Sequence, residues 1–320
     1  DYSWHLIFDV NVPVGLAAIL FAIFIQKEWR GARAGSFDWP GFLCVVCFMP
    51  LLIFALARGN SPLNPEGWSS PEVIGCFAVA AAALIVFIVR ELRCENPLLN
   101  LKLLGERNFG VSMAVLAIFG IGMLGGTYLL PLYMQKALGY TAIMAGSVFL
   151  PVGLIQGVLS TCSGFLTRYI KPLFIAVTGI LVMTLSFYFA SRFTLHTTHA
   201  QIMLVLYLRG FGMGLTFAPL NDFSLMNLSQ RDMASAAGIS NSIKQLSGSV
   251  SIALLTVILT GRTAFHSAQG GLSSAESYVA GISDDFLFVT FVSLASALPF
   301  LWLLRPRCKA ASFKSEGTGT

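Results

Sequence analysis

The chain has 320 residues, of which 56% are hydrophobic and only 11% charged, and its formal net charge is +5. Soluble domains carry about 25% charged residues, so this composition excludes an ordinary soluble fold and favours an integral membrane protein. The basic excess lies in short connections, where lipid headgroups and membrane topology explain it without a nucleic-acid partner.

Nine apolar stretches are each long enough to cross ~30 Å of hydrocarbon as a helix. They lie at about 5–25, 40–58, 72–90, 109–135, 142–165, 172–191, 201–224, 236–260 and 286–304. Long connections separate the first three stretches, and the last six follow one another more closely. We therefore expect one helix, then a helix pair, then a compact set of six.

Lys and Arg occupy every second connection, as at Lys27 and Arg30 after the first stretch and Arg305 and Arg307 after the last. By the positive-inside rule the N-terminus is outside and the C-terminal tail cytoplasmic. A chain that enters the membrane from outside needs an earlier crossing, so we expect a longer protein of which this is the C-terminal part. The small polar residues of 261–285 predict an outer loop, and those of 305–320 a disordered tail.

Glycine and proline gather in the fourth, fifth and seventh stretches, which favours close helix packing or mobile helices that line a pathway. The candidate hinge or packing positions are Gly122, Gly126, Pro131, Pro151, Gly210, Gly212, Gly214 and Pro219.

Ionisable side chains inside a membrane span are costly and usually functional. Four stand out as candidates for transport or coupling: Arg209, Lys244, Asp9 and Asp222. The two cations fit either hydrogen bonding to helix carbonyls at a gate or a direct role with substrate or protons. Asp222 fits either a structural role, as a helix-end cap or in an ion pair with Arg231, or a role in transport or coupling.

Polar uncharged and aromatic side chains near these positions predict an amphiphilic cavity. The cavity candidates are Tyr133, Gln135, Gln156, Asn221, Asn241 and Gln245. No cluster of acid, base and nucleophile is visible, so we expect no enzyme, no cofactor and no metal. His196 and His199 are interpreted as a solvated loop, and Cys44 and Cys47 as packing residues.

Five segments together resemble one family. They are W-H-L-I-F-D-V-N-V-P-V-G (4–15), D-W-P-G (38–41), P-L-Y-M-Q-K-A-L-G-Y-T-A-I-M-A-G-S-V-F-L-P (131–151), R-G-F-G-M-G-L-T-F-A-P-L (209–220) and A-S-A-A-G-I-S-N-S-I-K-Q-L-S-G-S (234–249). In order and spacing they are similar to the 14-helix drug:proton antiporter branch of the major facilitator superfamily, the EmrB/QacA type. The departures are His5 in place of Arg, Asp9 in place of an apolar residue, and Ser247 and Ser251 in place of glycines. The loop at 164–172 also lacks the Asp of the superfamily's loop motif.

The resemblance implies an all-α membrane fold whose spans are helices six to fourteen of the family. Residues 1–25 would be the last helix of the N-terminal bundle, 26–107 a linker helix pair and cytoplasmic loop, 108–304 the C-terminal six-helix bundle and 305–320 the tail. Arg209 and Lys244 would be the family's intramembrane basic positions.

The function implied is proton-coupled multidrug efflux by alternating access in the plasma (bacterial inner) membrane. Its partners would be lipid, protons, amphiphilic small molecules and, in two-membrane bacteria, a periplasmic adaptor and an outer-membrane channel. Export of another solute, such as a metabolite or siderophore, remains an alternative on the same fold. A non-transporting sensor or assembly subunit is a further alternative, and a membrane-embedded enzyme another.

Overall fold

The computed structural model describes residues 9, 11–25, 38–59, 61, 64–94, 97–230, 232–269, 271 and 273–303. Every regular element in these ranges is a helix, as the fold-class prediction required. The elements are α2 (Asn11–Ile25), α3 (Trp39–Gly59), η1 (Gly67–Ser69), α4 (Pro71–Arg93), η2 (Leu101–Gly105), α5 (Arg107–Lys136), α6 (Ala142–Leu166), α7 (Pro172–Ala190), α8 (His199–Leu225), α9 (Met233–Ala268), α10 (Ser274–Ala295) and α11 (Leu298–Leu303).

Eight helices of the described part are long and apolar enough to cross a membrane. They match the predicted stretches from the second to the ninth, and the last one extends from α10 into α11. Of the predicted first stretch, the described residues hold α2, whose 15 residues are all exposed. Residues 1–37 form a compact unit separate from residues 38–320. The predicted tail at 305–320 lies outside the described residues.

Local sequence signals explain where several helices begin. Thr141 accepts a hydrogen bond from the Met144 amide at 3.2 Å and so caps α6. Ser273 and Glu276 form a reciprocal capping box at the start of α10. Pro71 and Pro172 occupy the first positions of α4 and α7, where the missing N–H costs nothing.

The predicted outer loop at 261–285 is wrong. α9 continues to Ala268 and α10 already begins at Ser274, so only a short turn joins the two helices. The polar side chains that suggested a loop bond to one another across the two helices instead: the Arg262 Nε and His266 Nε2 atoms lie 2.6 and 2.8 Å from the same oxygen of Asp284. Mutual pairing satisfies these groups without a solvated loop.

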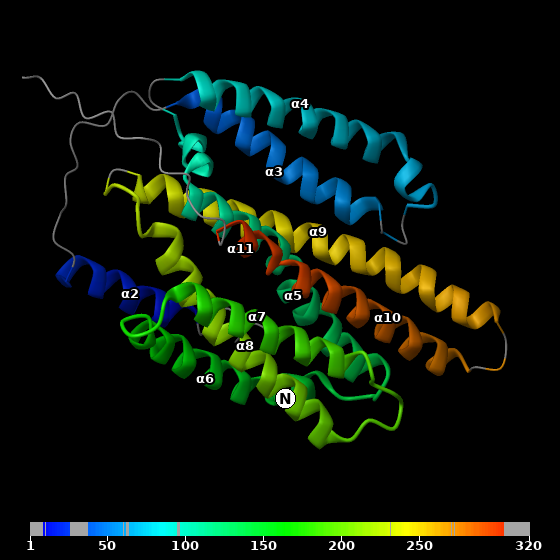
Figure 1. Cartoon of the computed structure of the whole chain (residues 1–320). Helices are drawn as coiled ribbons and strands as arrows, with labels where there is room; N and C mark the ends of the chain where they lie inside the picture. The colour runs from blue at the N-terminus through cyan, green and yellow to red at the C-terminus, as the bar shows by residue number, and fades with distance from the viewer. Residues whose placement is uncertain are drawn as a thin grey trace, which may run out of the picture. The chain divides into compact units, whose positions relative to one another are not determined.

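The core of the bundle is built around α5, which contacts α6, α8, α9, α10 and α11. α8 packs against α7 and α6 on its other sides, and α10 packs against α9, α5 and α7. Figure 1 shows α9 and α10 as two long neighbouring helices, with the α3–α4 pair as a separate hairpin that touches α9 through α3. This arrangement buries part of each span and leaves many large apolar side chains exposed, as contact with lipid requires.

Glycines set the distance between α8 and its two neighbours. A Cβ atom on Gly179 of α7 would lie 2.8 Å from the carbonyl oxygen of Gly212, and one on Gly212 would lie 2.8 Å from the Met183 amide nitrogen. On the side of α6, a Cβ on Gly214 would lie 3.0 Å from the Gln156 carbonyl oxygen, and one on Gly210 would lie 3.1 Å from that of Val152. Backbone therefore meets backbone on both sides of α8.

The other predicted hinge positions behave differently from one another. A Cβ on Gly126 would lie 2.4 Å from the Phe187 ring, whereas one on Gly122 would make only ordinary contacts. Pro131, Pro151 and Pro219 lie inside α5, α6 and α8, which continue through them.

Gly212→Ala is expected to lower the stability of the folded chain by ~1–3 kcal/mol, because backbone atoms of α7 cannot rotate away from the new methyl group. Thermal unfolding of the purified protein in lipid nanodiscs measures this as a lower Tm. Gly153→Ala on α6 is the matched control, since nothing lies within 4 Å of its Cβ position and alanine favours the helix. Equal Tm values for the two variants would contradict the close contact of α7 and α8.

Candidate functional site

Arg209 is a buried cation in the interior of α8, with 3% of its surface exposed. Its Nη2 atom donates hydrogen bonds to the Met123 carbonyl, at 3.2 Å, and to the Thr127 hydroxyl, both on α5. Its Nε atom is buried without a hydrogen-bond partner. No acid forms an ion pair with Arg209 within the described ranges. The guanidinium thus joins α8 to α5 through neutral acceptors and retains an unused donor.

Lys244 occupies a different place, on α9. Its Nζ atom lies 5.6 Å from the centre of the Phe217 ring of α8, which is within the range of a cation–π interaction. Lys244, Phe217 and Asn221 line one small cavity of about 20 Å³, room for a single water molecule. Phe217 follows Arg209 by eight residues, or ~12 Å along the helix, so the two cations do not share a site.

The structure brings only part of the predicted cavity together. Asn221 joins Lys244, whereas Asn241 and Gln245 are exposed on α9 and Gln135 is exposed at the end of α5. Gln156 is half-buried on α6, beside α8.

Tyr133 is a packing residue in this structure. It is fully buried, its hydroxyl donates a 2.6 Å hydrogen bond to the Thr194 carbonyl, and its ring stacks on Phe193. These contacts fix the end of α5 to the connection between α7 and α8.

The two acidic candidates lie apart from both cations. Asp222 is exposed beside Asn221, and Arg231, its predicted partner, lies outside the described residues. Asp9 is exposed and belongs to the separate N-terminal unit, so nothing places it relative to Arg209 or Lys244.

Asp285 is the residue that the sequence reading missed. It lies on α10 with none of its surface exposed, and neither carboxyl oxygen has a hydrogen-bond partner. Ser277 and Tyr278, on the same helix, and Thr263 of α9 also carry buried hydroxyls without partners. The spacing of 277, 278 and 285 places these groups on one face of α10.

Burying an ionised carboxylate without partners is very costly, so a carboxyl group in this position marks a candidate functional residue. The groups that interact with Asp285 electrostatically are Asp284 and Tyr278, and Tyr128 of α5 faces Tyr278. The carboxylate of Asp284 pairs with Arg262 and His266 instead. One sequence signal could have identified Asp285. Ser273 and Glu276 match a capping box, which predicts that a helix begins there and therefore contains Asp284 and Asp285.

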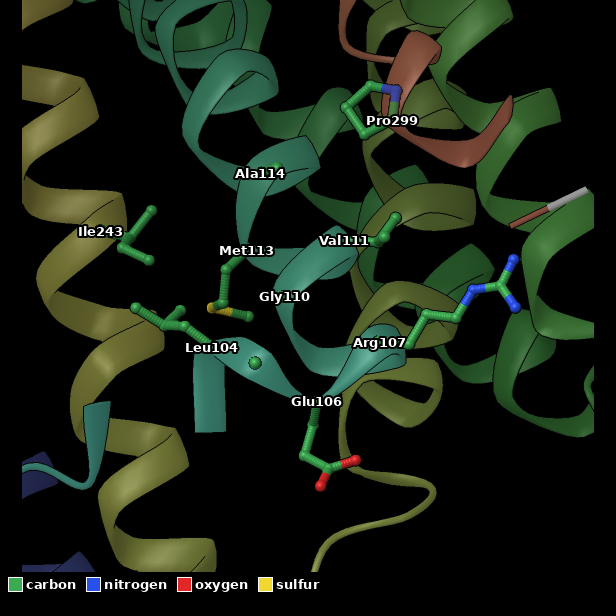
Figure 2. Close-up of a pocket in the computed structure, with 10 residues that line it drawn as sticks. Leu104, Glu106, Arg107, Gly110, Val111, Met113, Ala114, Ile243 and Pro299 are labelled. Atoms are coloured by element: carbon green, nitrogen blue, oxygen red, sulfur yellow. The ribbon is translucent and has the colours of Figure 1, made fainter. Parts of the chain in front are cut away.

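A groove with a volume of about 500 Å³ lies at the start of α5. Figure 2 shows Leu104, Met113 and Ile243 pointing toward one another between η2, α5 and α9, while Glu106 points away from them. The lining is mostly apolar, and although it includes Arg107, it contains neither Arg209 nor Lys244. We found no group of three potential metal ligands in the ranges that the structure describes.

Comparison with known proteins gives one family and a consistent set of relatives. Residues 1–252 match the family model described as Major Facilitator Superfamily. An uncharacterized MFS-type transporter, YhcA of Bacillus subtilis, is 32% identical over 269 residues, 84% of this chain and 50% of the relative. The multidrug export protein EmrB of Escherichia coli is 29% identical over 272 residues, 84% of this chain and 52% of the relative.

The puromycin resistance protein pur8 of Streptomyces alboniger is 28% identical over 323 residues, 97% of this chain and 62% of the relative. The chain therefore spans about half to three fifths of the length of these relatives. The names of the relatives confirm the resemblance to the drug:proton antiporter branch.

Proposed function

The chain belongs to the Major Facilitator Superfamily, and we propose that it forms the C-terminal part of a secondary transporter that exports amphiphilic small molecules in exchange for protons. It is a multi-pass protein of the plasma (bacterial inner) membrane, and lipid surrounds its spans. In this proposal residues 1–25 end an N-terminal bundle, 26–107 link the bundles, 108–304 form the C-terminal bundle and 305–320 form a cytoplasmic tail. Two bundles that rock against each other give alternating access.

The observation that carries the proposal is the buried guanidinium of Arg209. An ionisable side chain within a membrane span is expensive, and such residues usually mark a substrate or ion pathway. Here the cation is held by a carbonyl and a hydroxyl of α5, and one donor remains unused. We assign it the role of a gate residue that changes partners as the bundles move.

Asp285 is the candidate group that binds and releases the exchanged proton. A carboxyl without hydrogen-bond partners inside the bundle is protonated when it is closed off, and releases the proton when water reaches it. We assign proton binding to this residue and leave substrate contact to Lys244, Phe217 and Asn221, whose small cavity would widen on opening.

Three finer points belong to the same proposal. The relatives are named as transport, export and resistance proteins, which supports transport rather than catalysis. A periplasmic adaptor and an outer-membrane channel are proposed as partners where the cell has two membranes. The alternative is that the same residues export a metabolite or siderophore. If so, that solute should compete with the dye for efflux.

Efflux of an amphiphilic cationic dye from cells that express the full-length transporter tests the proposal. We expect dye efflux that stops when a protonophore collapses the proton gradient. Lys244→Ala should lower the rate about tenfold or more, a loss of ~1.4 kcal/mol or more, whereas Lys244→Arg keeps the cation over the Phe217 ring and retains most of the rate.

Lys102→Ala, an exposed lysine of η2, is the matched control and should transport normally. If Lys244→Ala transported dye at the wild-type rate at equal expression, Lys244 would not be part of the substrate site. Efflux that ignores the proton gradient would overturn the proposed exchange.

A further inference from the structure

The hairpin of α3 and α4 contains a second buried acidic group, away from the cations of the bundle. Asp38 precedes α3, and 2% of its side chain is exposed. Its Oδ1 atom accepts hydrogen bonds from the Gly41 amide at 3.1 Å and from the Arg90 Nε atom at 2.8 Å. Burial raises the pKa of Asp38, but these two hydrogen bonds and the charge of Arg90 outweigh it, so the pKa is lowered overall. Asp38 is therefore an ionised cap.

Glu91 follows Arg90 on α4 and is buried more deeply, with 1% of its surface exposed. Its Oε2 atom accepts a hydrogen bond from the Leu99 amide at 3.3 Å. Its Oε1 atom and the Asp38 Oδ2 atom are both buried without hydrogen-bond partners.

The two unpartnered oxygens border the same small space, above the Cα atom of Gly41. A Cβ atom at Gly41 would lie 2.4 Å from Asp38 Oδ2 and 3.3 Å from Glu91 Oε1. Two ionised carboxylates that face each other out of water repel strongly, and one of such a pair holds a proton. A single proton between these oxygens gives both of them a hydrogen bond.

We propose that Glu91 and Asp38 form a proton-binding site, in which Glu91 carries the proton and donates it from Oε1 to Asp38 Oδ2. Arg90 then balances the charge of Asp38, and the buried cluster is neutral. The proton is the ligand, because no third His, Cys, Asp or Glu side chain joins the two carboxyl groups among the residues that the structure describes. The site does not depend on the proposed transport activity.

The surrounding titratable groups are consistent with one proton. Arg90 acts on Glu91 as well as on Asp38, and the titratable groups that act on Arg90 besides Asp38 are Cys94 and Cys44. The charged residue of η2, Lys102, is exposed. Among these groups only Arg90 carries a charge next to the pair, and its Nε already bonds Asp38.

The protonated pair also joins the hairpin to the bundle. Glu91 holds the Leu99 amide, and the next residue, Asn100, bonds α9 and its preceding turn: its amide donates to the Ser235 hydroxyl, and its Nδ2 donates to Asp232 Oδ1 at 3.2 Å. Loss of the proton would set two negative charges against each other at this junction. The site therefore makes the attachment of α3 and α4 to α9 sensitive to pH.

Infrared difference spectroscopy between low and high pH, on the purified chain in lipid nanodiscs, tests the site directly. A protonated carboxylic acid has a carbonyl stretch that a carboxylate lacks. We expect Glu91→Gln to remove one such component from the wild-type spectrum at neutral pH. Asp38→Asn should remove the same component, since Glu91 then ionises and accepts a hydrogen bond from the new amide.

Glu72→Gln is the matched control, because Glu72 pairs with Arg58 at 3.3 Å at the other end of the same hairpin and is 51% exposed. It should leave the spectrum unchanged. Thermal unfolding tests whether the Glu91 side chain acts as a hydrogen-bond donor or only fills space. Glu91→Gln keeps a donor and should keep the wild-type Tm. Glu91→Met is equal in size but has no donor, and should lower the Tm. An unchanged spectrum in both Glu91→Gln and Asp38→Asn, or equal Tm values for the Gln and Met variants, would overturn the site.

Discussion

Replacing Arg209 with alanine is expected to abolish drug efflux by the full-length transporter while leaving its insertion into the membrane intact. The substitution removes the only cation that joins α8 to α5 in the described structure, together with its hydrogen bonds to Met123 and Thr127. Insertion becomes easier without a charge that costs ~2.5–3.5 kcal/mol at the centre of a span. Drug resistance and dye efflux, measured at matched membrane expression, should both fall more than tenfold.

Three further variants show which property of Arg209 efflux requires. Arg209→Lys keeps the charge but loses the planar fork, so an intermediate rate is expected. Thr127→Val removes one acceptor and should weaken efflux less than Arg209→Ala. Arg192→Ala changes an exposed arginine whose side chain hydrogen-bonds to Tyr188 and lies over its ring, away from α5, and should transport normally. Normal resistance in Arg209→Ala at normal expression would make this arginine a structural residue.

Asp285→Asn is expected to uncouple efflux from the proton gradient, with a loss of at least about tenfold in proton-driven transport. Asparagine has the shape of the protonated acid but cannot release a proton, so the protein should fold normally and remain fixed in one protonation state. Downhill exchange of dye in liposomes, without a gradient, should survive. The readout is the ratio of gradient-driven to downhill dye flux.

Asp284→Asn is the matched control for Asp285→Asn, since it changes the neighbouring carboxyl of the same helix. It weakens the pairs with Arg262 and His266, so a lower Tm is expected while the proton dependence of transport persists. If Asp285→Asn kept a normal proton dependence, or if both variants lost it equally, the assignment of proton binding to Asp285 would be wrong.

Apolar length was sufficient to predict a fold of membrane-spanning helices. Each span from the second to the seventh lies close to its predicted range, because the bilayer thickness sets a minimum length that few other forces modify, whereas the eighth runs on to Ala268. The last span was misplaced because polar residues were interpreted as exposed to solvent. Arg262, His266 and Asp284 satisfy one another between helices, and pairing of this kind depends on tertiary contacts that the residue types alone do not reveal.

The candidate site was predicted less completely for the same reason. Arg209 was recognised because a cation amid apolar residues is conspicuous, whereas Asp285 follows a polar segment and appeared to be part of a loop. Tyr133 was placed in a cavity on its chemistry, although packing against Phe193 and Thr194 determines its position. Burial and partner choice are properties of the assembled bundle.

The backbone contacts of α8 with both of its neighbours limit how this bundle can change shape. Gly179 and Gly212 hold α7, and Gly210 and Gly214 hold α6, with no layer of side chains between the backbones. Side chains can exchange rotamers during a motion, but touching backbones can only separate or slide as units. We therefore expect helices α6, α7 and α8 to move as one unit, with bending of the bundle confined to the seam where α5, α9 and α10 meet them. Arg209 bridges that seam.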